Sequence, residues 1–291
     1  MIEQMLEFDQ YKETVIRTFV SMDEFYRYIT ETPFNKHFAW ANPKDIHSLA
    51  GSYFFTKTSN FDQASKMFKD GWQDKAATLT QKLKTAMAAA TPVQRPRPAY
   101  NVQGYQASVP RYLQGLPDSM ITKKNVPVKQ KVVELTKAIS YTADVTPEQI
   151  EEQSIKCLMI VERLESLGYR VILNVIRANW DFSGPKGHKV RHLEVAKVRI
   201  KSAAERLNIS KVAFPLVHPS MLRRLMFRYT EVSPTVPKSF VDGYGCPLAA
   251  SKIRALLKET SNGKEIFIPA FINGDVSQIN SIDDLQSIND W

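Results

Sequence analysis

The sequence is poor in cysteine and contains no long apolar run. Its only cysteines, Cys157 and Cys246, give neither a disulfide framework nor a metal-binding spacing, so we expect a reducing cytosol. No run of about 18 apolar residues occurs, which excludes a membrane-spanning helix. The first residues, MIEQMLEFDQ, lack the basic start and apolar core of a secretion signal. We therefore expect a cytoplasmic protein with no membrane partner.

Motifs for common chemistry are also missing. Neither Gly-x-x-x-x-Gly-Lys-Ser/Thr nor Gly-x-Gly-x-x-Gly occurs. His188 and His192 lie in a strand or loop pattern, where a four-residue spacing does not align two metal ligands. His218 could act as a base and Cys246 as a thiolate near arginines, but no partner group is suitably spaced, which favours structural roles. We expect no catalytic residue, cofactor or metal, and we favour a non-enzymatic protein without excluding an enzyme.

The positive charge is concentrated in one part of the chain. The formal net charge is +9, yet residues 1–90 carry 11 basic and 11 acidic side chains. Between Lys186 and Arg228 there are 11 basic residues and only two acidic ones, Glu194 and Glu205. Such a local excess is typical of proteins that contact an anionic partner.

The stretch from Lys131 to Trp180 has the pattern of a strand, a helix and a second strand. Thr146 and Gln149 form a capping box, and Gly168 suits the left-handed conformation that ends a helix. The flanking runs, 132–139 and 169–176, are apolar and β-branched. A strand–helix–strand unit pairs its strands in parallel with a right-handed crossover.

Further strands are expected at 193–200 and 265–268, so residues 131–291 should form an α/β domain with a mixed or mostly parallel sheet. Residues 1–90 are expected to form a small, mainly helical domain. Its helices should start near Ser21 and Asn60, with a break at Gly71 and a short strand at 52–56. A helix capped by Ser251 and another capped by Ser281 should follow in the C-terminal part.

Residues 91–130 contain six of the 16 prolines and show no periodicity, which is typical of an extended basic connector. We expect residues 105–120 to drape over the second domain and bury their apolar side chains there. The alternative is that tyrosines and arginines of this connector, such as Tyr100 and Arg111, follow a single nucleic acid strand.

Two clusters of basic residues are the candidate binding site. In the strand at 193–200 the alternate residues should form a basic stripe, and the helix after Pro219 should project three arginines. The alternatives are a solvated sheet edge for the stripe and pairing with carboxylates such as Glu231 for the arginines. The predicted nucleic-acid contacts are Lys186, Lys189, Arg191, Lys197, Arg199, Lys201, Arg223, Arg224 and Arg228.

Three segments resemble a family of uncharacterised bacteriophage proteins over about residues 22–245. They are PRYLQGLPDSM (Pro110–Met120), LESLGYRV (Leu164–Val171) and FPLVHPSMLRRLMFRY (Phe214–Tyr229), followed by GYG (Gly243–Gly245). The resemblance implies a phage or prophage origin and the cytoplasm of an infected bacterium, and it implies no activity.

The strand, the capped helix and LESLGYRV also loosely resemble the start of a von Willebrand factor A-like domain. Such domains hold a divalent metal through Asp-x-Ser-x-Ser after the first strand. Here the matching residues, 140–144, read SYTAD. Because hard cations need several oxygen ligands at fixed positions, we expect the metal site to be lost.

These observations predict a non-enzymatic phage protein that contacts DNA or RNA through a basic face without reading the sequence. The alternative is an interaction or assembly factor, such as a scaffold or host-defence antagonist, whose basic face docks an acidic protein. Both hypotheses require that the clustered cations share one exterior surface and lack internal counter-ions.

Overall fold

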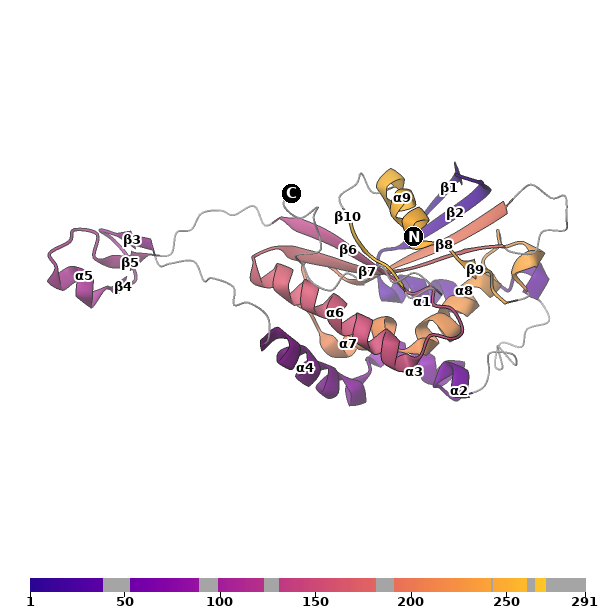
Figure 1. The fold of residues 1–291 in the computed structure, drawn as a ribbon, viewed down its shortest axis with the longest axis horizontal. Helices are drawn as coiled ribbons and strands as arrows, with labels where there is room; N and C mark the ends of the chain where they lie inside the picture. The colour runs from indigo at the N-terminus through magenta and orange to yellow at the C-terminus, as the bar shows by residue number, and fades with distance from the viewer. Residues whose placement is uncertain are drawn as a thin grey trace.

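A mixed β-sheet of seven strands forms the centre of the fold (Figure 1). The computed structural model describes residues 1–38, 53–88, 99–122, 131–181, 191–241, 243–260 and 265–270. The strands follow the order β1-β2-β8-β7-β6-β10, and β9 pairs with β7. Their bounds are β1 (Ile2–Phe8), β2 (Tyr11–Phe19), β6 (Val132–Ala138), β7 (Arg170–Trp180), β8 (Arg191–Lys201), β9 (Cys246–Pro247) and β10 (Glu265–Ile268). The expected α/β class is confirmed.

The predicted strand–helix–strand unit is present. Strands β6 and β7 pair in parallel, and α6 (Pro147–Ser166) connects them. The side chain of Thr146 accepts a hydrogen bond from the backbone of Gln149, whose side chain bonds back to Thr146. Gly168 takes a φ of 89°, which favours glycine at the end of a helix. The sheet is mixed because β8 runs antiparallel to β7, while β2 and β10 run parallel to β8 and β6.

The N-terminal residues do not match the expected helical region. They form β1 and β2, and β2 pairs with β8, so the start of the chain completes the sheet built by residues 131–270. A separate helical domain over residues 1–90 is therefore not confirmed. The charged residues Glu3 and Arg17 interrupt the apolar alternation that would have indicated these two strands, although Arg17 is fully buried.

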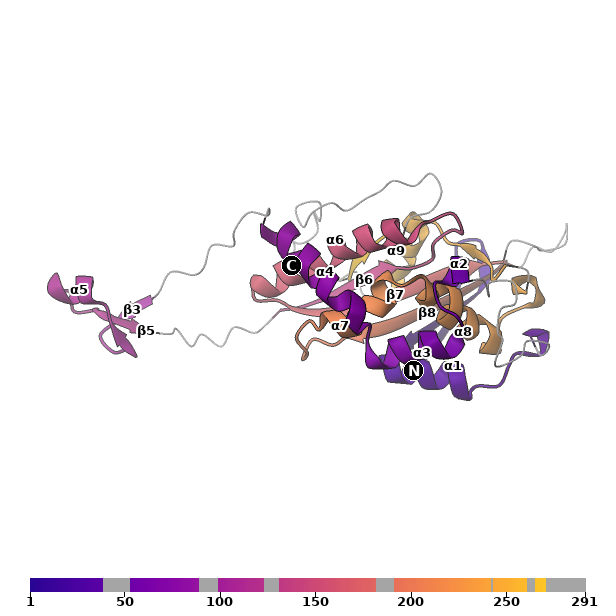
Figure 2. The same cartoon turned by 90° about the horizontal axis from the view of Figure 1, so that it is seen from below.

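Helices cover one face of the sheet, and α9 (Ala250–Thr260) lies on the other (Figures 1 and 2). Helices from the first part of the chain contact α6, α7 and the π-helical segment η2, and side chains from both parts share one apolar core. The helical segments on this side are α1 (Met22–Glu31), α2 (Tyr53–Thr56), α3 (Phe61–Asp70), α4 (Gln73–Ala88), α7 (Ile209–Val217), η2 (Met221–Met226) and α8 (Phe227–Val232). The short 3₁₀ turns are η1 (Lys36–Phe38) and η3 (Lys238–Phe240).

Several local predictions can be compared with these bounds. Ser21 and Asn60 cap α1 and α3, and Gly71 separates α3 from α4, as expected. The strand predicted at 52–56 is wrong, because these residues include α2, a single helical turn. Ser251 lies inside α9 rather than before it. The helix predicted after Ser281 lies outside the described residues.

Residues 99–122 form a second, smaller sheet, which we call the arm. It consists of β3 (Ala99–Asn101), β4 (Gln106–Ala107), the helical turn α5 (Val109–Leu113) and β5 (Met120–Thr122), in the order β3-β5-β4. Among the described strands, these three pair only with one another. The prediction that residues 105–120 bury their apolar side chains is wrong, because Tyr105, Tyr112 and Leu113 are exposed.

Candidate functional site

The predicted contacts at the start of β8 are only partly described. Lys186 and Lys189 lie outside the described residues. Arg191 is exposed, and its guanidinium carbon lies 5.4 Å from the ring centroid of Trp180. A cation over an indole face is attracted to the ring quadrupole but can still bind other groups. Arg191 is thus the one exposed residue among the described predicted contacts.

Lys197 is 8% exposed, and carboxylates of the same sheet balance its charge. Its Nζ lies 2.9 Å from Oε1 of Glu134 and 2.8 Å from Oε1 of Glu265. Burial opposes ionisation of Glu134, but Lys197 outweighs burial and holds the pKa of this carboxyl below its ordinary value. Arg199 is half-buried on the same strand. Lys197 therefore has two internal counter-ions.

Lys201 does not continue a stripe from Lys197 and Arg199. The register of β7 against β8 shifts between Leu173 and Asn174, which changes the alternation at the end of β8. The Nζ of Lys201 is buried, 2.6 Å from Oε1 of Glu165 on α6 and 2.8 Å from the carbonyl oxygen of Val171. The expected three-residue basic stripe is therefore wrong.

Arg223 and Arg224 of η2 are 4% and 3% exposed and bind the segment that contains α2. Arg223 Nη1 donates to the carbonyl oxygen of Phe55 at 2.8 Å. Arg224 Nε donates to Oγ1 of Thr58 at 2.6 Å, and its Nη2 donates to the carbonyl oxygen of Thr58 at 2.8 Å. These arginines donate hydrogen bonds to carbonyl and hydroxyl oxygens of a neighbouring segment instead of projecting outward.

Arg228 is buried between aromatic rings. Its guanidinium carbon lies 4.8 Å from the ring centroid of Phe34 and 4.6 Å from that of Phe61, and its Nε lies 3.6 Å from Oε2 of Glu231. The alternative that the arginines lie beside carboxylates such as Glu231 therefore holds for Arg228 and not for Arg223 or Arg224. The predicted contacts that the structure describes are therefore not gathered on one exterior surface.

The most extensive buried polar cluster was not predicted. Glu194, in the middle of β8, is fully buried and accepts hydrogen bonds from Arg17 at 2.5 Å and from Tyr229 at 2.6 Å. It also accepts from Ser233 at 2.8 Å and contacts His192 Nε2 at 2.9 Å. Burial opposes its charge, but these partners hold the pKa of Glu194 below its ordinary value. Because Glu194 accepts this many hydrogen bonds inside the protein, its role is structural rather than proton transfer.

The other candidates for chemistry have structural roles. His218 is buried between the rings of Trp72 and Phe214, and its Nδ1 accepts the backbone N–H of Ser220 at 3.1 Å. Burial lowers the pKa of His218 to about 4, so its ring is neutral at pH 7. Burial also raises the pKa of the half-buried Cys246 thiol, which disfavours the thiolate.

Two further features are absent from the described ranges. No group of three or more His, Cys, Asp or Glu side chains there is arranged to hold a metal ion. No helix in these ranges combines the length and the apolar character needed to cross a lipid bilayer.

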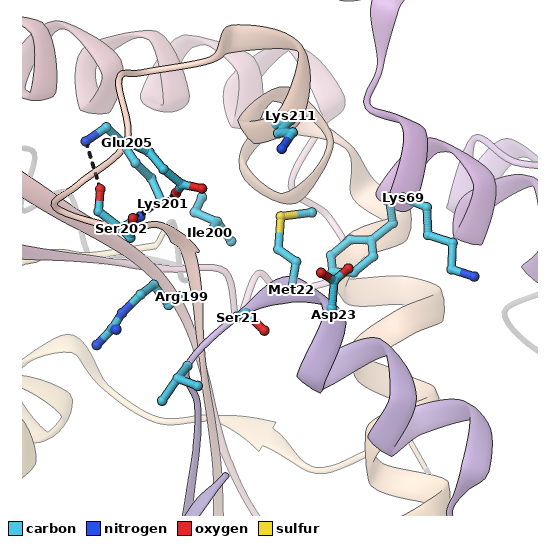
Figure 3. Close-up of a pocket in the computed structure, with 12 residues that line it drawn as sticks. Ser21, Met22, Asp23, Lys69, Arg199, Ile200, Lys201, Ser202, Glu205 and Lys211 are labelled. Carbon is cyan, nitrogen blue, oxygen red and sulfur yellow. Dashed lines mark hydrogen bonds between the residues drawn. The ribbon is translucent and has the colours of Figure 1, made fainter.

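A cavity of about 210 Å³ lies where the end of β8 meets α1, α3 and α7. Its lining includes Lys69, Arg199 and Lys211 together with Asp23 and Glu205. Figure 3 shows Lys69 and Arg199 pointing away from each other on opposite sides of the pocket. The amine of Lys69 lies over the ring of Tyr26, 4.1 Å from its centroid. The cavity is therefore lined by both basic and acidic side chains, and its basic side chains do not converge on one point.

The arm exposes apolar side chains instead. Tyr112 is 70% exposed and Leu113 is 78% exposed, and Val102, Tyr105 and Val109 are exposed as well. No apolar side chain between residues 100 and 122 is buried. Contiguous exposed apolar surface marks an interaction site more often than isolated apolar residues do. The arm is therefore the candidate functional surface of the described chain.

These features define a mixed α/β protein that carries a small apolar arm. The chain belongs to the family described as "Domain of unknown function (DUF7192)", whose model matches residues 7–286. No curated protein and no solved structure matches the chain. The resemblances to bacteriophage proteins and to von Willebrand factor A-like domains stay predictions. The family match spans both boundaries that the sequence predicted, at residues 90 and 130.

Proposed function

We propose that this protein is an interaction or assembly protein that associates with a protein surface through its arm. The observation that carries the proposal is the exposure of Tyr105, Val109, Tyr112 and Leu113 on a unit with no buried apolar side chain. Burying one such side chain contributes about 1.5–3 kcal/mol. Contact with another protein would supply this burial.

The size of the arm supports the same conclusion. Units below about 40 residues usually need a disulfide, a metal or another chain for stability. The arm spans residues 99–122 and contains no cysteine and no histidine, so it has neither a disulfide nor the cysteine and histidine ligands of a structural zinc site. Aromatic residues are enriched at the centre of protein interfaces, which suits its three tyrosines.

The charges of the arm do not favour a nucleic acid. Its only charged residues, Arg111 and Asp118, lie 2.6 Å apart, and the guanidinium of Arg111 also covers the ring of Tyr100. Backbone contact with DNA or RNA depends on cations that replace counter-ions. The one cation within residues 99–122 is already paired, so we place the contact on the apolar side chains of the arm rather than on the basic face predicted from the sequence.

Capture by the tagged full-length chain from a nuclease-treated extract of its own cells tests the proposal. The double variant Tyr112→Ser/Leu113→Ser removes the two most exposed apolar side chains of the arm. Leu167→Ser is the matched control, because Leu167 is exposed at the end of α6. We expect one identified protein, the chain itself included, to be captured by the wild type and the control and lost with the double variant.

Retention that disappears with nuclease would favour the nucleic-acid hypothesis and contradict this proposal. Equal capture by the wild type and the double variant would contradict it as well, because the arm would then play no part.

A further inference from the structure

We infer that β1 is a docking strand, to which an extended, basic segment of a partner protein adds a further strand of the sheet. This contact is separate from the arm and goes beyond the proposed function. Three features of β1 support it: its unpaired backbone edge, its exposed apolar side chains, and the negative charge around it.

The first feature is the unpaired backbone edge. Strand β1 lies at the end of the large sheet, where it pairs with β2 and with no other described strand (Figure 1). In a paired strand about half of the backbone N–H and C=O groups point to each side, so the outer groups of β1 have no strand partner among the described residues. Residues 2–6 pair with β2 without a break, and the register shifts only between Leu6 and Phe8. The outer edge of β1 is therefore regular enough for another extended segment to pair with it.

The second feature is that β1 lacks the features that usually protect a sheet edge. Edge strands of soluble proteins are commonly very short, carry lysine or proline, or lie under another segment. Strand β1 is seven residues long and contains no lysine, arginine or proline. Ile2 is exposed instead, and Met5 is 65% exposed. Because side chains alternate along a strand, these two lie on opposite faces, and a bound segment can cover both.

The third feature is the negative charge of the hairpin that β1 forms with β2. Residues 2–19 contain four acidic and two basic side chains, whereas the whole chain has a formal net charge of +9. Glu7 of β1 is exposed. Glu3 binds Arg17, but this buried arginine is shared with Glu194, so the three side chains together keep one negative charge. The sheet edge at β1 is thus negative within a basic protein.

This charge distinguishes between the possible occupants of the edge. The β1 edge of a second copy would bring the same glutamates, and like charges opposite each other destabilise paired strands. A nucleic acid or an anionic membrane also brings negative charge, and neither offers an extended peptide backbone. Lysine or arginine opposite Glu3 and Glu7 adds electrostatic attraction to the backbone hydrogen bonds. The occupant that fits is therefore a segment of another protein that is extended, basic and free of acidic side chains.

Fluorescence anisotropy with a short labelled peptide of alternating lysine and valine tests the inference. The protein is the full-length chain without an N-terminal tag, at about 0.05 M salt. Valine favours the extended conformation, so we expect this peptide to bind, and we expect added salt to weaken the binding. A peptide of alternating lysine and proline carries the same charge but has no backbone N–H at each proline, so it should bind about tenfold more weakly or not at all. A peptide of alternating glutamate and valine should not bind.

The double variant Met5→Lys/Glu7→Lys gives β1 the lysines that protect other edge strands. It should raise the dissociation constant of the lysine–valine peptide about tenfold or more. The matched control is Leu167→Lys/Glu259→Lys, which makes the same change in net charge at exposed residues of other elements and should affect the constant much less. Because all four side chains are exposed, thermal unfolding of both variants should match that of the wild type.

Hydrogen exchange of the backbone amides locates the contact. An added strand accepts hydrogen bonds from the outward N–H groups of β1, so the bound lysine–valine peptide should slow exchange within residues 2–8. Slower exchange at another part of the chain, with residues 2–8 unchanged, overturns the inference.

The binding experiment has equally clear contrary outcomes. Absence of binding by the lysine–valine peptide at low salt, equal binding of the lysine–proline peptide, or equal binding by the double variant of β1 overturns the inference. Slower exchange of residues 2–8 at high protein concentration without any peptide assigns the edge to a second copy and overturns it as well. The proposed function of the arm is tested separately, because Tyr112→Ser/Leu113→Ser leaves β1 unchanged and Met5→Lys/Glu7→Lys leaves the arm unchanged.

Discussion

Replacing Glu194 with glutamine removes the charge that balances Arg17 in the core. The guanidinium of Arg17 is fully buried and lies 2.5 Å from Oε1 of Glu194 and 2.6 Å from Oε2 of Glu3. Removing one partner of a buried ion pair typically destabilises a protein by about 3–5 kcal/mol. Because Glu3 remains as a second, partly exposed partner, we expect the free energy of unfolding to fall by about 3 kcal/mol, the lower end of this range.

Urea unfolding of the full-length protein measures this loss. The matched control is Glu3→Gln, which removes the more exposed carboxylate and should lower the free energy of unfolding by about 1 kcal/mol or less. A loss below about 1 kcal/mol for Glu194→Gln would refute the argument that the Glu194 carboxylate balances the buried guanidinium.

The effect of Glu194→Gln on the free energy of unfolding should also depend on pH. The folded state lowers the pKa of Glu194, so its contribution is present above the unfolded pKa of about 4.3 and is lost as the pH falls through the folded value. The difference in unfolding free energy between wild type and Glu194→Gln should therefore shrink in acid. A difference that stays constant from neutral to strongly acidic pH contradicts this account.

Three further substitutions test other parts of the structure. Burial lowers the pKa of Lys137 to about 8, so Lys137→Met should raise the unfolding free energy at pH 7, and the gain should shrink as the pH rises above 8. Burial raises the pKa of Glu231 to about 8, so wild-type stability should fall as the pH rises from about 4.3 towards that value, and Glu231→Gln should flatten the fall in urea titrations. A Cβ at Gly104 would lie 2.2 Å from the carbonyl oxygen of Ile121, so Gly104→Ala should weaken arm-dependent capture of a partner and leave the thermal unfolding of the large sheet unchanged.

The elements predicted correctly are those whose signals are local. The capping box at Thr146, the left-handed Gly168 and the apolar run of β7 all lie within 35 residues of chain, and each specifies its own geometry. The strand β10 was found because its four residues are mostly apolar. Periodicity and caps act over a few residues, so a sequence displays them directly.

The strand β2 was missed because the burial of its charged residue depends on distant residues, and β1, which pairs with β2, is mostly exposed. Arg17 interrupts the apolar alternation of β2, and only its pairing with Glu194, far along the chain, makes that position a buried one. The arm was missed for a different reason. Its strands are two or three residues long and lie among prolines and glycines, a composition that favours an irregular connector.

The basic face was misjudged because a count of charges along the chain contains no information on pairing. Lys197 meets Glu134 and Glu265, and each partner lies more than 60 residues away in sequence. Arg223 and Arg224 are held by carbonyl and hydroxyl oxygens, which no charge count includes. A local excess of lysine and arginine therefore predicts an exterior cationic surface only when the fold leaves those side chains outside.

The use of these cations inside the fold changes what the protein offers to a partner. A lysine between two carboxylates contributes little to the field outside the protein, so Lys197 adds little to the charge that a partner meets. Scattered exposed charges of one sign keep copies of a chain apart at low salt. The arm itself is neutral, but the segments that join it to α4 and β6 carry Arg95, Arg97, Lys123, Lys124 and Lys129 and no acidic residue. Recognition through the apolar side chains of the arm should therefore depend less on salt than binding through a basic face would.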